Sequence, residues 1–233
     1  MCGRFTRVTD ARQMEVIFEL NDIPRTFTPQ FNLAPTQLAT VVRGSPDARH
    51  ASQLRWGLIP SWAKDEKIGY RTINARAETL AEKPAFRSAF RRQRCLVLAD
   101  GFFEWERQGK QKKLPHYFCM ADRQPFAFAG LWERWRGPKD SPLADPVESF
   151  TIITTEPNEL LSPLHDRMPA ILWADDYDMW LDRDLDRTEV LAKLLGPYPA
   201  EEMDTHRVST IVNSPQNDIP DCIQPLAGHD SSS

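Results

Sequence analysis

The sequence is short of several features that would assign a protein to a well-marked class. It has four cysteines in 233 residues, and none of them forms a C-x-x-C pair, so no zinc site is predicted. No apolar run reaches the ~18–20 residues that span a bilayer, and no secretory signal or other targeting segment is visible. Glycine-rich phosphate loops are also absent. We therefore predict a cytoplasmic protein, associated with the nucleoid when bound to DNA, with no metal, cofactor or membrane attachment.

The composition that is present is typical of a globular domain. Hydrophobic residues make up 41% of the chain and charged residues 27%, and this length suits one domain with a sizeable core. Cys95 and Cys119 lie in apolar, strand-like runs and are predicted to be buried, with no disulfide framework. We predict a single domain over 2–226, followed by a tail at 227–233 whose small, polar residues are typical of disorder.

Short apolar runs and few helical patterns predict an α+β fold. Helices are predicted after an Asp10 or Thr9 cap with Met14, Ile17, Phe18 and Leu20 on one face, near Pro84, and over 175–181 and 188–195. Strands are predicted at 38–43, 54–59, 95–99, 102–107, 115–120, 126–131, 150–154 and 208–212, with a lysine-rich turn at 108–113. Because the strands mostly do not alternate with helices, we expect a curled, barrel-like, mostly antiparallel sheet flanked by helices.

Charge is distributed unevenly along the chain. Residues 1–138 hold 23 of the 29 basic residues and 14 of the 33 acidic ones, whereas 139–233 hold 6 and 19. A basic half favours a surface that contacts a polyanion, although solvated surface charge gives the same pattern. The densest basic stretch favours a groove for phosphates. It contains Arg71, Arg76, Arg87, Arg91, Arg92 and Arg94.

The start of the chain offers unusual chemistry. If Met1 is removed, Cys2 becomes the first residue and carries a thiol beside a primary amine. Such an aminothiol condenses with an aldehyde through a Schiff base, and its thiol then closes a thiazolidine ring in a step favoured by proximity. Both groups titrate near neutral pH, at about 7.7–8.0 for the amine and about 8.5 for the thiol. Taken by itself, a cysteine at this position is more often accidental.

Polar residues elsewhere could assist this chemistry. Glu104 lies between a phenylalanine pair and a tryptophan, so it is either a desolvated acid–base group or a strand residue that points outward. Asn74 and Arg76 could position a nucleophile and hold a phosphate, or be a helix cap and a surface residue. His165 could be catalytic or structural. The adjacent Asp166 is not expected to orient the ring, because side chains at successive positions diverge.

Several motifs, in order along nearly the whole chain, resemble the SRAP family of SOS-response-associated peptidases, or abasic-site processing proteins. Each motif is weak alone, but the ordered set is highly specific. The motifs are Met1-Cys2-Gly3-Arg4-Phe5, Asn32-Leu33-Ala34-Pro35-Thr36, Arg55-Trp56-Gly57-Leu58-Ile59-Pro60-Ser61-Trp62, Ile73-Asn74-Ala75-Arg76-Ala77-Glu78-Thr79, Gly101-Phe102-Phe103-Glu104-Trp105 and His165-Asp166-Arg167-Met168-Pro169.

The resemblance implies a protein that covalently captures abasic sites in single-stranded DNA, with autoproteolytic release of Met1 and weak lyase activity. By position, the catalytic residues it implies are Cys2 as nucleophile, Asn74 to orient the N-terminus, Glu104 as general acid–base group and His165 as assistant. The DNA-binding residues it implies are Arg4, Pro35, Trp62, Arg76 and Trp105. Ala63 stands where some members have a second tryptophan, so the stacking surface is expected to differ.

Three functions follow as hypotheses. The first is a thiazolidine crosslink between Cys2 and an abasic site, formed by a monomeric protein. The second is an N-terminal-nucleophile thiol peptidase or amidase that acts on peptides in trans. The third is a non-catalytic binder of single strands, which predicts reversible, salt-sensitive and lesion-indifferent binding. The basic half of the chain disfavours the second hypothesis, and the set Asn74, Glu104 and His165 disfavours the third. The segment 137–148 receives no predicted role.

Overall fold

The computed structural model describes residues 2–24, 27–45, 48–108 and 112–226. Its centre is a closed barrel in which β10 lies between β4 and β9, and β3 and β6 complete the ring. The pairing of β4 with β10 is parallel and the other pairings of the ring are antiparallel. The barrel-like α+β fold predicted from the sequence is therefore confirmed. The barrel strands are β3 (Leu38–Ser45), β4 (Ala48–Trp56), β6 (Arg94–Ala99), β9 (Phe126–Trp135) and β10 (Val147–Thr155).

Alternate residues of the barrel strands pack into two separate cores. On β3, Val41 belongs to the core inside the barrel and Val42 to the core outside it, because successive side chains of a strand point to opposite faces. Aromatic rings fill the inside. Phe5 packs edge-on against Trp56 and Phe128, with ring centroids 5.1 and 5.8 Å apart. Phe5 carries the N-terminal segment into this core.

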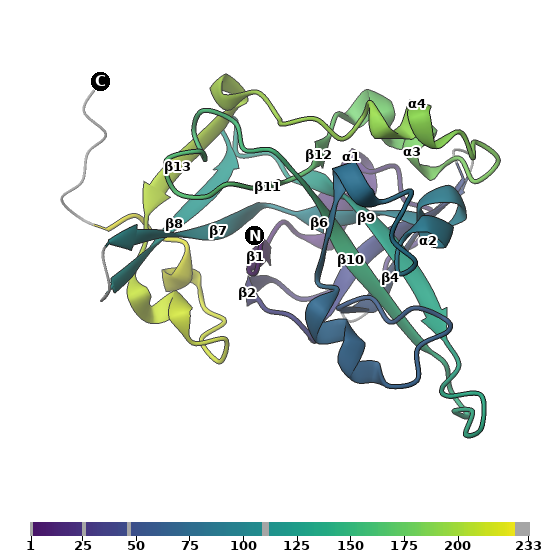
Figure 1. Cartoon of the computed structure of the whole chain (residues 1–233). Helices are drawn as coiled ribbons and strands as arrows, with labels where there is room; N and C mark the ends of the chain where they lie inside the picture. Colours follow the sequence, from purple (N-terminus) through teal and green to yellow (C-terminus); the bar gives the residue numbers. More distant parts are fainter. Residues whose placement is uncertain (1, 25–26, 46–47, 109–111, 227–233) are drawn as a thin grey trace.

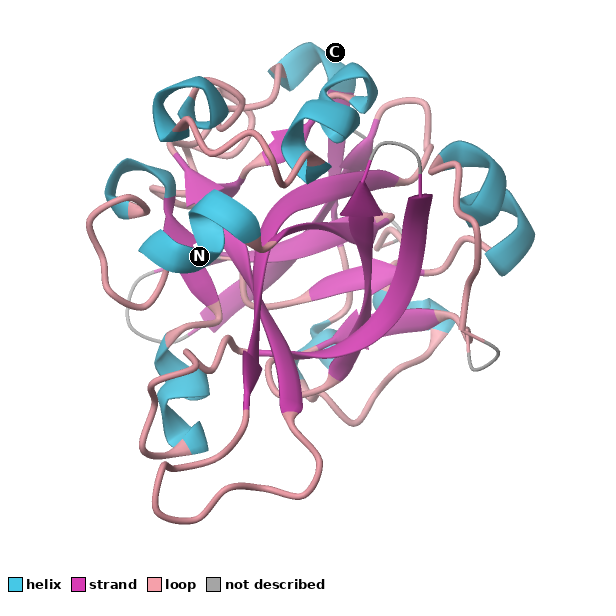
Figure 2. Cartoon of the chain, turned by 90° about the vertical axis from the view of Figure 1, so that its right-hand side faces the viewer, coloured by secondary structure: helices cyan, strands magenta, loops and turns pink. Residues whose placement is uncertain are grey.

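The outer core is covered by short helices, which lie around the strands in Figure 2. Met14 of α1, Phe90 of α2, Trp180 of α3 and Leu191 of α4 are buried there. Asp10 caps α1 by accepting a hydrogen bond from the Gln13 amide, as predicted. The helices are α1 (Ala11–Ile17), α2 (Arg87–Arg92), α3 (Tyr177–Leu181) and α4 (Thr188–Ala192), and the 3₁₀ helices are η1 (Glu66–Arg71), η2 (Ala77–Thr79), η3 (Ala174–Asp176), η4 (Ala200–Glu202), η5 (Thr210–Asn213) and η6 (Pro220–Cys222).

A second sheet places the start of the chain in the middle of the molecule. Its order is β13–β8–β7–β1–β2, and its strand β1 lies beside the N-terminus near the middle of the molecule in Figure 1. Short strands extend the larger sheet, and β5 and β11 both pair with β10. The remaining strands are β1 (Phe5–Arg7), β2 (Gln30–Leu33), β5 (Asn74–Arg76), β7 (Gly101–Gln108), β8 (Lys112–Met120), β11 (Met168–Pro169), β12 (Ile171–Leu172) and β13 (Met203–Arg207).

The structure corrects several local predictions. The strand predicted at 54–59 ends at Trp56, because Gly57 has φ +118° and turns the chain. The predicted strand 208–212 is largely the 3₁₀ helix η5, and the edge strand is β13 instead. Ile17 is 38% exposed rather than buried. Residues 109–111 of the lysine-rich turn and the tail at 227–233 lie outside the described residues.

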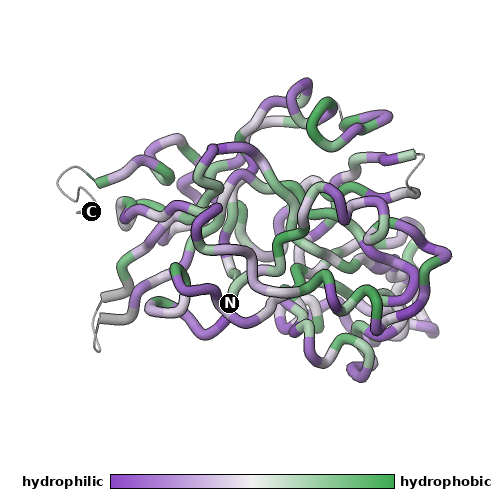
Figure 3. Tube along the Cα trace, turned by 90° about the horizontal axis from the view of Figure 1, so that it is seen from above, coloured by the Kyte–Doolittle hydropathy of each residue, from purple (hydrophilic) through white to green (hydrophobic). Residues whose placement is uncertain are grey.

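Hydrophobic residues concentrate in the central strands, and hydrophilic ones lie toward the periphery (Figure 3). Cys2, Cys95, Cys119 and Cys222 are all buried and free, as predicted for the middle two. Within the described part of the chain, no helix has the length and apolarity to cross a membrane. The same residues contain no group of histidine, cysteine and acidic side chains that could hold a metal ion.

Candidate functional site

Cys2 is held in the interior core, beside β7. Phe5 pairs with Phe102 across β1 and β7, and the Phe103 amide donates to the Arg4 carbonyl at 3.0 Å. The chain before β1 therefore continues along β7 toward Glu104. The Cys2 side chain is fully buried and belongs to the core inside the barrel. Burial, and secondly the negative charge of Glu104, raise the pKa of the Cys2 thiol well above its ordinary range.

Asn74 connects the larger sheet to the N-terminal segment. It lies on β5, which pairs in parallel with β10 at Ile152. Its Nδ2 donates a hydrogen bond of 2.7 Å to the Cys2 carbonyl, so the amide side chain fixes the backbone at Cys2. Its Oδ1 is buried and has no hydrogen-bond partner among the described residues. A buried acceptor without a partner is costly in a native structure, and this one lies next to the Cys2 backbone.

Glu104 is the buried acid of this region. Its side chain is 3% exposed, and burial raises its pKa from 4.5 to about 7. Phe103 and Trp105 pack in a separate core on the other face of β7, as strand alternation requires. Of the two interpretations of Glu104, the structure therefore supports the desolvated carboxyl. A carboxyl that titrates near pH 7 can both give and accept a proton under neutral conditions.

His165 lies in the loop before β11, and its Nδ1 has two neighbours. The Arg167 amide donates to Nδ1 at 3.0 Å, and the Asp166 Oδ1 lies 2.9 Å from the same atom. The expectation that Asp166 cannot orient the ring is therefore wrong, because the turn of the loop brings the two side chains together. A neutral ring accepts from the Arg167 amide, whereas a protonated ring can donate to Asp166.

A bidentate ion pair attaches this loop to the segment that carries Asn74. The Arg167 guanidinium donates to Glu78 through Nη1 at 2.6 Å and Nη2 at 3.0 Å, and Nη2 also contacts the Thr154 carbonyl. Such a fork fixes both distance and orientation. The hydrogen bonding to Arg167 lowers the pKa of Glu78. Sequence reasoning missed this pair, although both residues lie within the motifs that suggested the family.

The structure thus gathers the predicted catalytic residues, here called the N-terminal site: Cys2, Asn74, Glu104 and His165. Asn74 bonds to Cys2, the charge of Glu104 acts on the Cys2 thiol, and the charge of Asp166, which contacts His165, raises the pKa of Glu104. The arrangement places an amide, an acid with a pKa near 7 and an imidazole loop around one N-terminal residue.

Arg4 and Trp105 form one side of this region. Arg4 Nη1 donates to Asn32 Oδ1 at 2.7 Å and to the Val212 carbonyl at 2.8 Å, and its guanidinium lies 5.8 Å from the centre of the Trp105 ring. The Trp105 Nε1 donates to Asn213 Oδ1 at 2.7 Å. Burial lowers the pKa of Arg4, and a cation fixed in this way is preorganised for an anion.

The other predicted DNA-binding residues lie on exposed segments. Trp62 is 57% exposed, and its Nε1 donates to the Pro84 carbonyl at 3.3 Å. Arg76 is exposed two residues after Asn74 on β5, and residues at this spacing share a face. Pro35 is half-buried in the turn between β2 and β3. Ala63 is buried, so it adds nothing to an exposed stacking surface.

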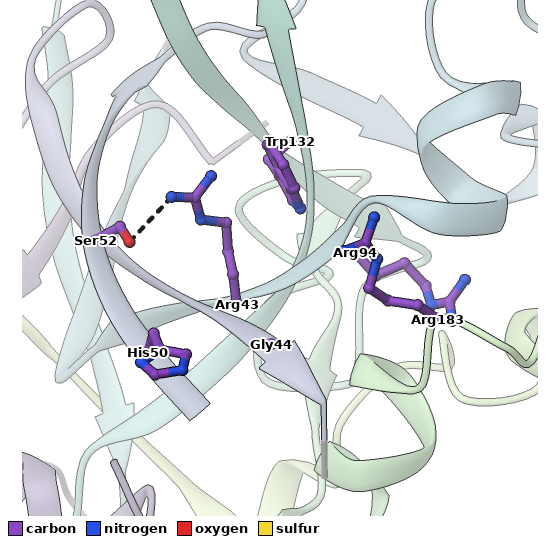
Figure 4. A pocket seen from close by; sticks show the side chains of 7 residues that line it. All are labelled: Arg43, Gly44, His50, Ser52, Arg94, Trp132 and Arg183. Carbon is purple, nitrogen blue, oxygen red and sulfur yellow. Dashed lines mark hydrogen bonds between the residues drawn. The ribbon is translucent and has the colours of Figure 1, made fainter. Parts of the chain in front are cut away.

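The arginines predicted to line one phosphate groove do not all face solvent. Arg94 is buried, and it donates to the carbonyls of Phe90, Arg91, Trp180, Asp182 and Leu185. It belongs to a cavity of about 240 Å³, here called the Arg94 pocket, which is shown in Figure 4. The pocket is lined by Arg43, Gly44, His50, Ser52, Arg94, Trp132 and Arg183.

Comparisons with known proteins find relatives over most of the chain. A family model described as SOS response associated peptidase (SRAP) matches residues 1–215. Abasic site processing protein YoqW of Bacillus subtilis (strain 168) is 43% identical over 226 residues, covering 96% of this chain and 99% of that protein. Abasic site processing protein HMCES of Xenopus tropicalis is 34% identical over 227 residues, covering 84% of this chain and 66% of that protein. A crystal structure of a protein from Bacteroides thetaiotaomicron superposes with a TM-score of 0.80 at 30% identity, covering 95% of this chain and 99% of that one.

Proposed function

This chain belongs to the SOS response associated peptidase (SRAP) family, and we propose that it captures abasic sites in single-stranded DNA through a covalent bond to Cys2. The relatives named above are abasic site processing proteins, which supports an abasic site as the substrate. The observation that carries the proposal is the 2.7 Å bond from Asn74 to the Cys2 carbonyl beside a buried Glu104. It holds an N-terminal aminothiol next to a group that can move protons.

The reaction begins once Met1 has been removed. The amine of Cys2 adds to the C1′ aldehyde of the ring-opened deoxyribose, and loss of water gives a Schiff base. The Cys2 sulfur then bonds to the same carbon, and the thiol proton passes to the ring nitrogen, which leaves a thiazolidine. Because burial raises the pKa of the thiol, the thiol is protonated at neutral pH. The amine therefore attacks first, and the sulfur adds second.

Each neighbour of Cys2 has a role in this scheme. Glu104, with a pKa of about 7, protonates the sugar ring oxygen as it opens and the hydroxyl that leaves as water. Asn74 holds the Cys2 backbone so that the amine faces the aldehyde, and its Oδ1 accepts a hydrogen bond from that amine. His165 assists proton transfer at the Schiff base. The Schiff base also permits β-elimination at the neighbouring phosphate, so weak lyase activity accompanies capture.

DNA binding is assigned to the residues that flank the N-terminal site. Arg4 and Arg76 contact backbone phosphates, and Trp62, Trp105 and Pro35 pack against the bases on either side of the lesion. The exposure of Trp62 and Arg76 and the fixed position of Arg4 beside Trp105 support this assignment.

The experiment that tests capture uses a single-stranded oligonucleotide with one abasic site. Wild-type protein is expected to give a heat-stable, shifted band whose mass equals protein without Met1 plus DNA minus one water. Cys2→Ala retains an amine but no thiol, and is expected to give no heat-stable band. A tetrahydrofuran analogue, which has no aldehyde, is the matched control and should not crosslink. A Cys2→Ala protein that forms the same stable band would refute the thiazolidine.

Removal of Met1 is a separate step of the proposal. We propose that Cys2 and its neighbours hydrolyse the bond after Met1 themselves. Alanine at position 2 is small enough for ordinary aminopeptidases, so intact mass separates the two routes. Retention of Met1 in Cys2→Ala protein supports self-processing, whereas its loss assigns the step to an aminopeptidase.

A further inference from the structure

The last residues of η1 present an aromatic ring to solvent. Tyr70 is 62% exposed, among the most exposed large side chains of the described chain. The Arg55 guanidinium lies 5.9 Å from the centre of its ring. An exposed ring beside a cation has the two properties that unpaired bases and their phosphates require.

The surroundings of this ring are basic. Lys67, Ile68, Tyr70 and Arg71 line a surface hollow of about 460 Å³. Lys67 has one weak ion pair, 3.9 Å from Asp65, and Arg71 and Arg55 form no ion pair within the described ranges. The Asp65 side chain also caps η1 by accepting from the Lys67 amide. Arg55 and Arg71 therefore have no charged partner within ion-pair distance in the described part of the chain, although the acidic Glu66 lies in the same 3₁₀ helix.

Arg55 has hydrogen-bonding capacity that the fold does not use. Its Nη1 is buried, and no residue in the described part of the chain accepts a hydrogen bond from it. A Cβ atom at Gly69 would lie 2.9 Å from this nitrogen. The glycine therefore lets the guanidinium pass beneath η1 to Tyr70.

Hydrogen bonds of the three residues 72–74 fix the segment that joins Tyr70 to the N-terminal site. Thr72 Oγ1 donates to the Leu58 carbonyl, Trp56 Nε1 donates to the Ile73 carbonyl at 2.9 Å, and Asn74 Nδ2 donates to the Cys2 carbonyl at 2.7 Å. The four steps of chain from Tyr70 to Asn74 span at most about 14 Å when extended. Tyr70 is thus held within a few nucleotides of Cys2, at roughly 3.4 Å of rise per nucleotide.

We propose that Tyr70, Arg55, Lys67 and Arg71, here called the Tyr70 platform, form a subsite for the same DNA strand beyond the bases that flank the abasic site. One base stacks on Tyr70, and the adjacent phosphates contact Lys67 and Arg71. Arg55 supports the ring from within the protein. The proposal rests on the proposed function for the nature of the strand, and it extends the binding site outward from the lesion.

Anisotropy titrations with fluorescent oligonucleotides test the platform. They use the tetrahydrofuran analogue, so that binding stays reversible, in a short form centred on the lesion and in forms extended on the 5′ or the 3′ side. Tyr70→Ala is expected to weaken binding of one extended form by about 5- to 100-fold. Binding of the short form should stay unchanged. Tyr70→Phe, which keeps the aromatic ring, should bind like the wild type.

The salt dependence of binding tests the cations. Arg71→Ala is expected to reduce the slope of log K against log salt by about 0.7 for the same extended form. Arg187→Ala removes an exposed arginine at the start of α4 and should leave the slope unchanged. Thermal melting of each variant confirms that folding is retained.

The outcomes separate this proposal from the proposed function. If Tyr70→Ala binds every extended form as tightly as the wild type, or weakens the short form equally, the platform is refuted. Crosslinking of a true abasic site by the wild type is measured in parallel. If the wild type crosslinks and Tyr70→Ala has no effect on binding, the platform is refuted and covalent capture is retained. If Tyr70→Ala weakens binding but the wild type does not crosslink, covalent capture is refuted and the platform is retained as a site for single strands.

Discussion

Two parts of this protein place arginine beside tryptophan, and they differ in how the cations are satisfied. In the Arg94 pocket, Arg43 lies 4.4 Å from the centre of the Trp132 ring and pairs with Glu148 at 3.0 Å. Arg94 gives its donors to backbone carbonyls. All three nitrogens of the Arg94 guanidinium bond within the protein, and Arg43 Nη2 donates to Ser52 and pairs with Glu148.

The region around the N-terminal site leaves polar atoms unused. Asn74 Oδ1 and Arg55 Nη1 have no partner in the part of the chain that is described, and Trp62 and Tyr70 are exposed. Unused buried donors and acceptors are costly in a protein that folds for stability alone. The two regions of this protein therefore differ: buried polar atoms without partners and exposed aromatic rings lie in one, whereas in the other Arg94 is bonded through all three nitrogens of its guanidinium.

The largest expected effect is a loss of stability in the Arg94 pocket, where the arginine is fully hydrogen-bonded. Arg94→Ala leaves several buried carbonyls without donors, so we expect a loss of about 3 kcal/mol or more of unfolding free energy. Urea unfolding measures it. Arg183→Ala changes an exposed residue of the same pocket and should alter stability by less than about 0.5 kcal/mol. Loss of DNA capture by folded Arg94→Ala protein would contradict the structural role.

An intermediate effect is expected for the pH dependence of stability. The pKa of Glu104 rises from 4.5 to about 7 on folding, so the folded protein keeps a proton that the unfolded chain releases between these values. This stabilisation is complete below about pH 4.5, is lost as pH rises through about 7, and amounts to roughly 3 kcal/mol.

Glu104→Gln should remove this pH dependence and also slow crosslinking. Urea unfolding of both proteins at acidic and alkaline pH measures it. Glu82→Gln, at an exposed position after η2, is the control and should follow the wild-type curve. If the unfolding free energies of wild type and Glu104→Gln change with pH in the same way, the Glu104 carboxyl is not the source of the pH dependence.

The smallest expected effect concerns the two neighbours of His165. Asp166→Asn keeps the hydrogen bond from the Arg167 amide but removes the carboxylate that accepts from a protonated ring. Because the Asp166 side chain is 82% exposed, the ion pair contributes about 1 kcal/mol or less. We expect crosslinking to slow by up to about fivefold, mainly at acidic pH, with partial recovery in Asp166→Glu. Rate–pH profiles measure it, and a uniform loss at all pH values would indicate a structural role instead.

Much of the architecture could be predicted from local patterns. The positions of β6, β7 and β9 follow from apolar runs, and the Asp10 cap follows from the residue preferred at a helix start. The strand predicted at 208–212 failed because 210–213 adopts a 3₁₀ helix capped by Ser209. Such a short apolar run does not distinguish the two structures, and tertiary packing decides between them.

The candidate site was predictable as a set of residues but not as a set of contacts. The motifs suggested Cys2, Asn74, Glu104 and His165. The contact between Asp166 and His165 and the ion pair between Arg167 and Glu78 depend on the conformation of the loop before β11. That ion pair joins residues far apart in the chain, so no local pattern predicts it. The roles of the four residues stay predictions, and the experiments above test those of Cys2 and Glu104 directly and that of His165 through Asp166.

The amino-acid sequence by itself determined the chemical inventory: a cysteine beside the initiator, an amide, a carboxyl and an imidazole in recognisable motifs, and a barrel-like α+β fold. Tertiary structure alone decided which of these groups are desolvated and which cations stay unpaired. Glu104 was ambiguous along the chain and Arg94 was predicted to line a phosphate groove, and both are buried. The physical reason is that burial and hydrogen-bond satisfaction depend on partners from distant segments, which only the closed barrel and its neighbouring sheet bring together.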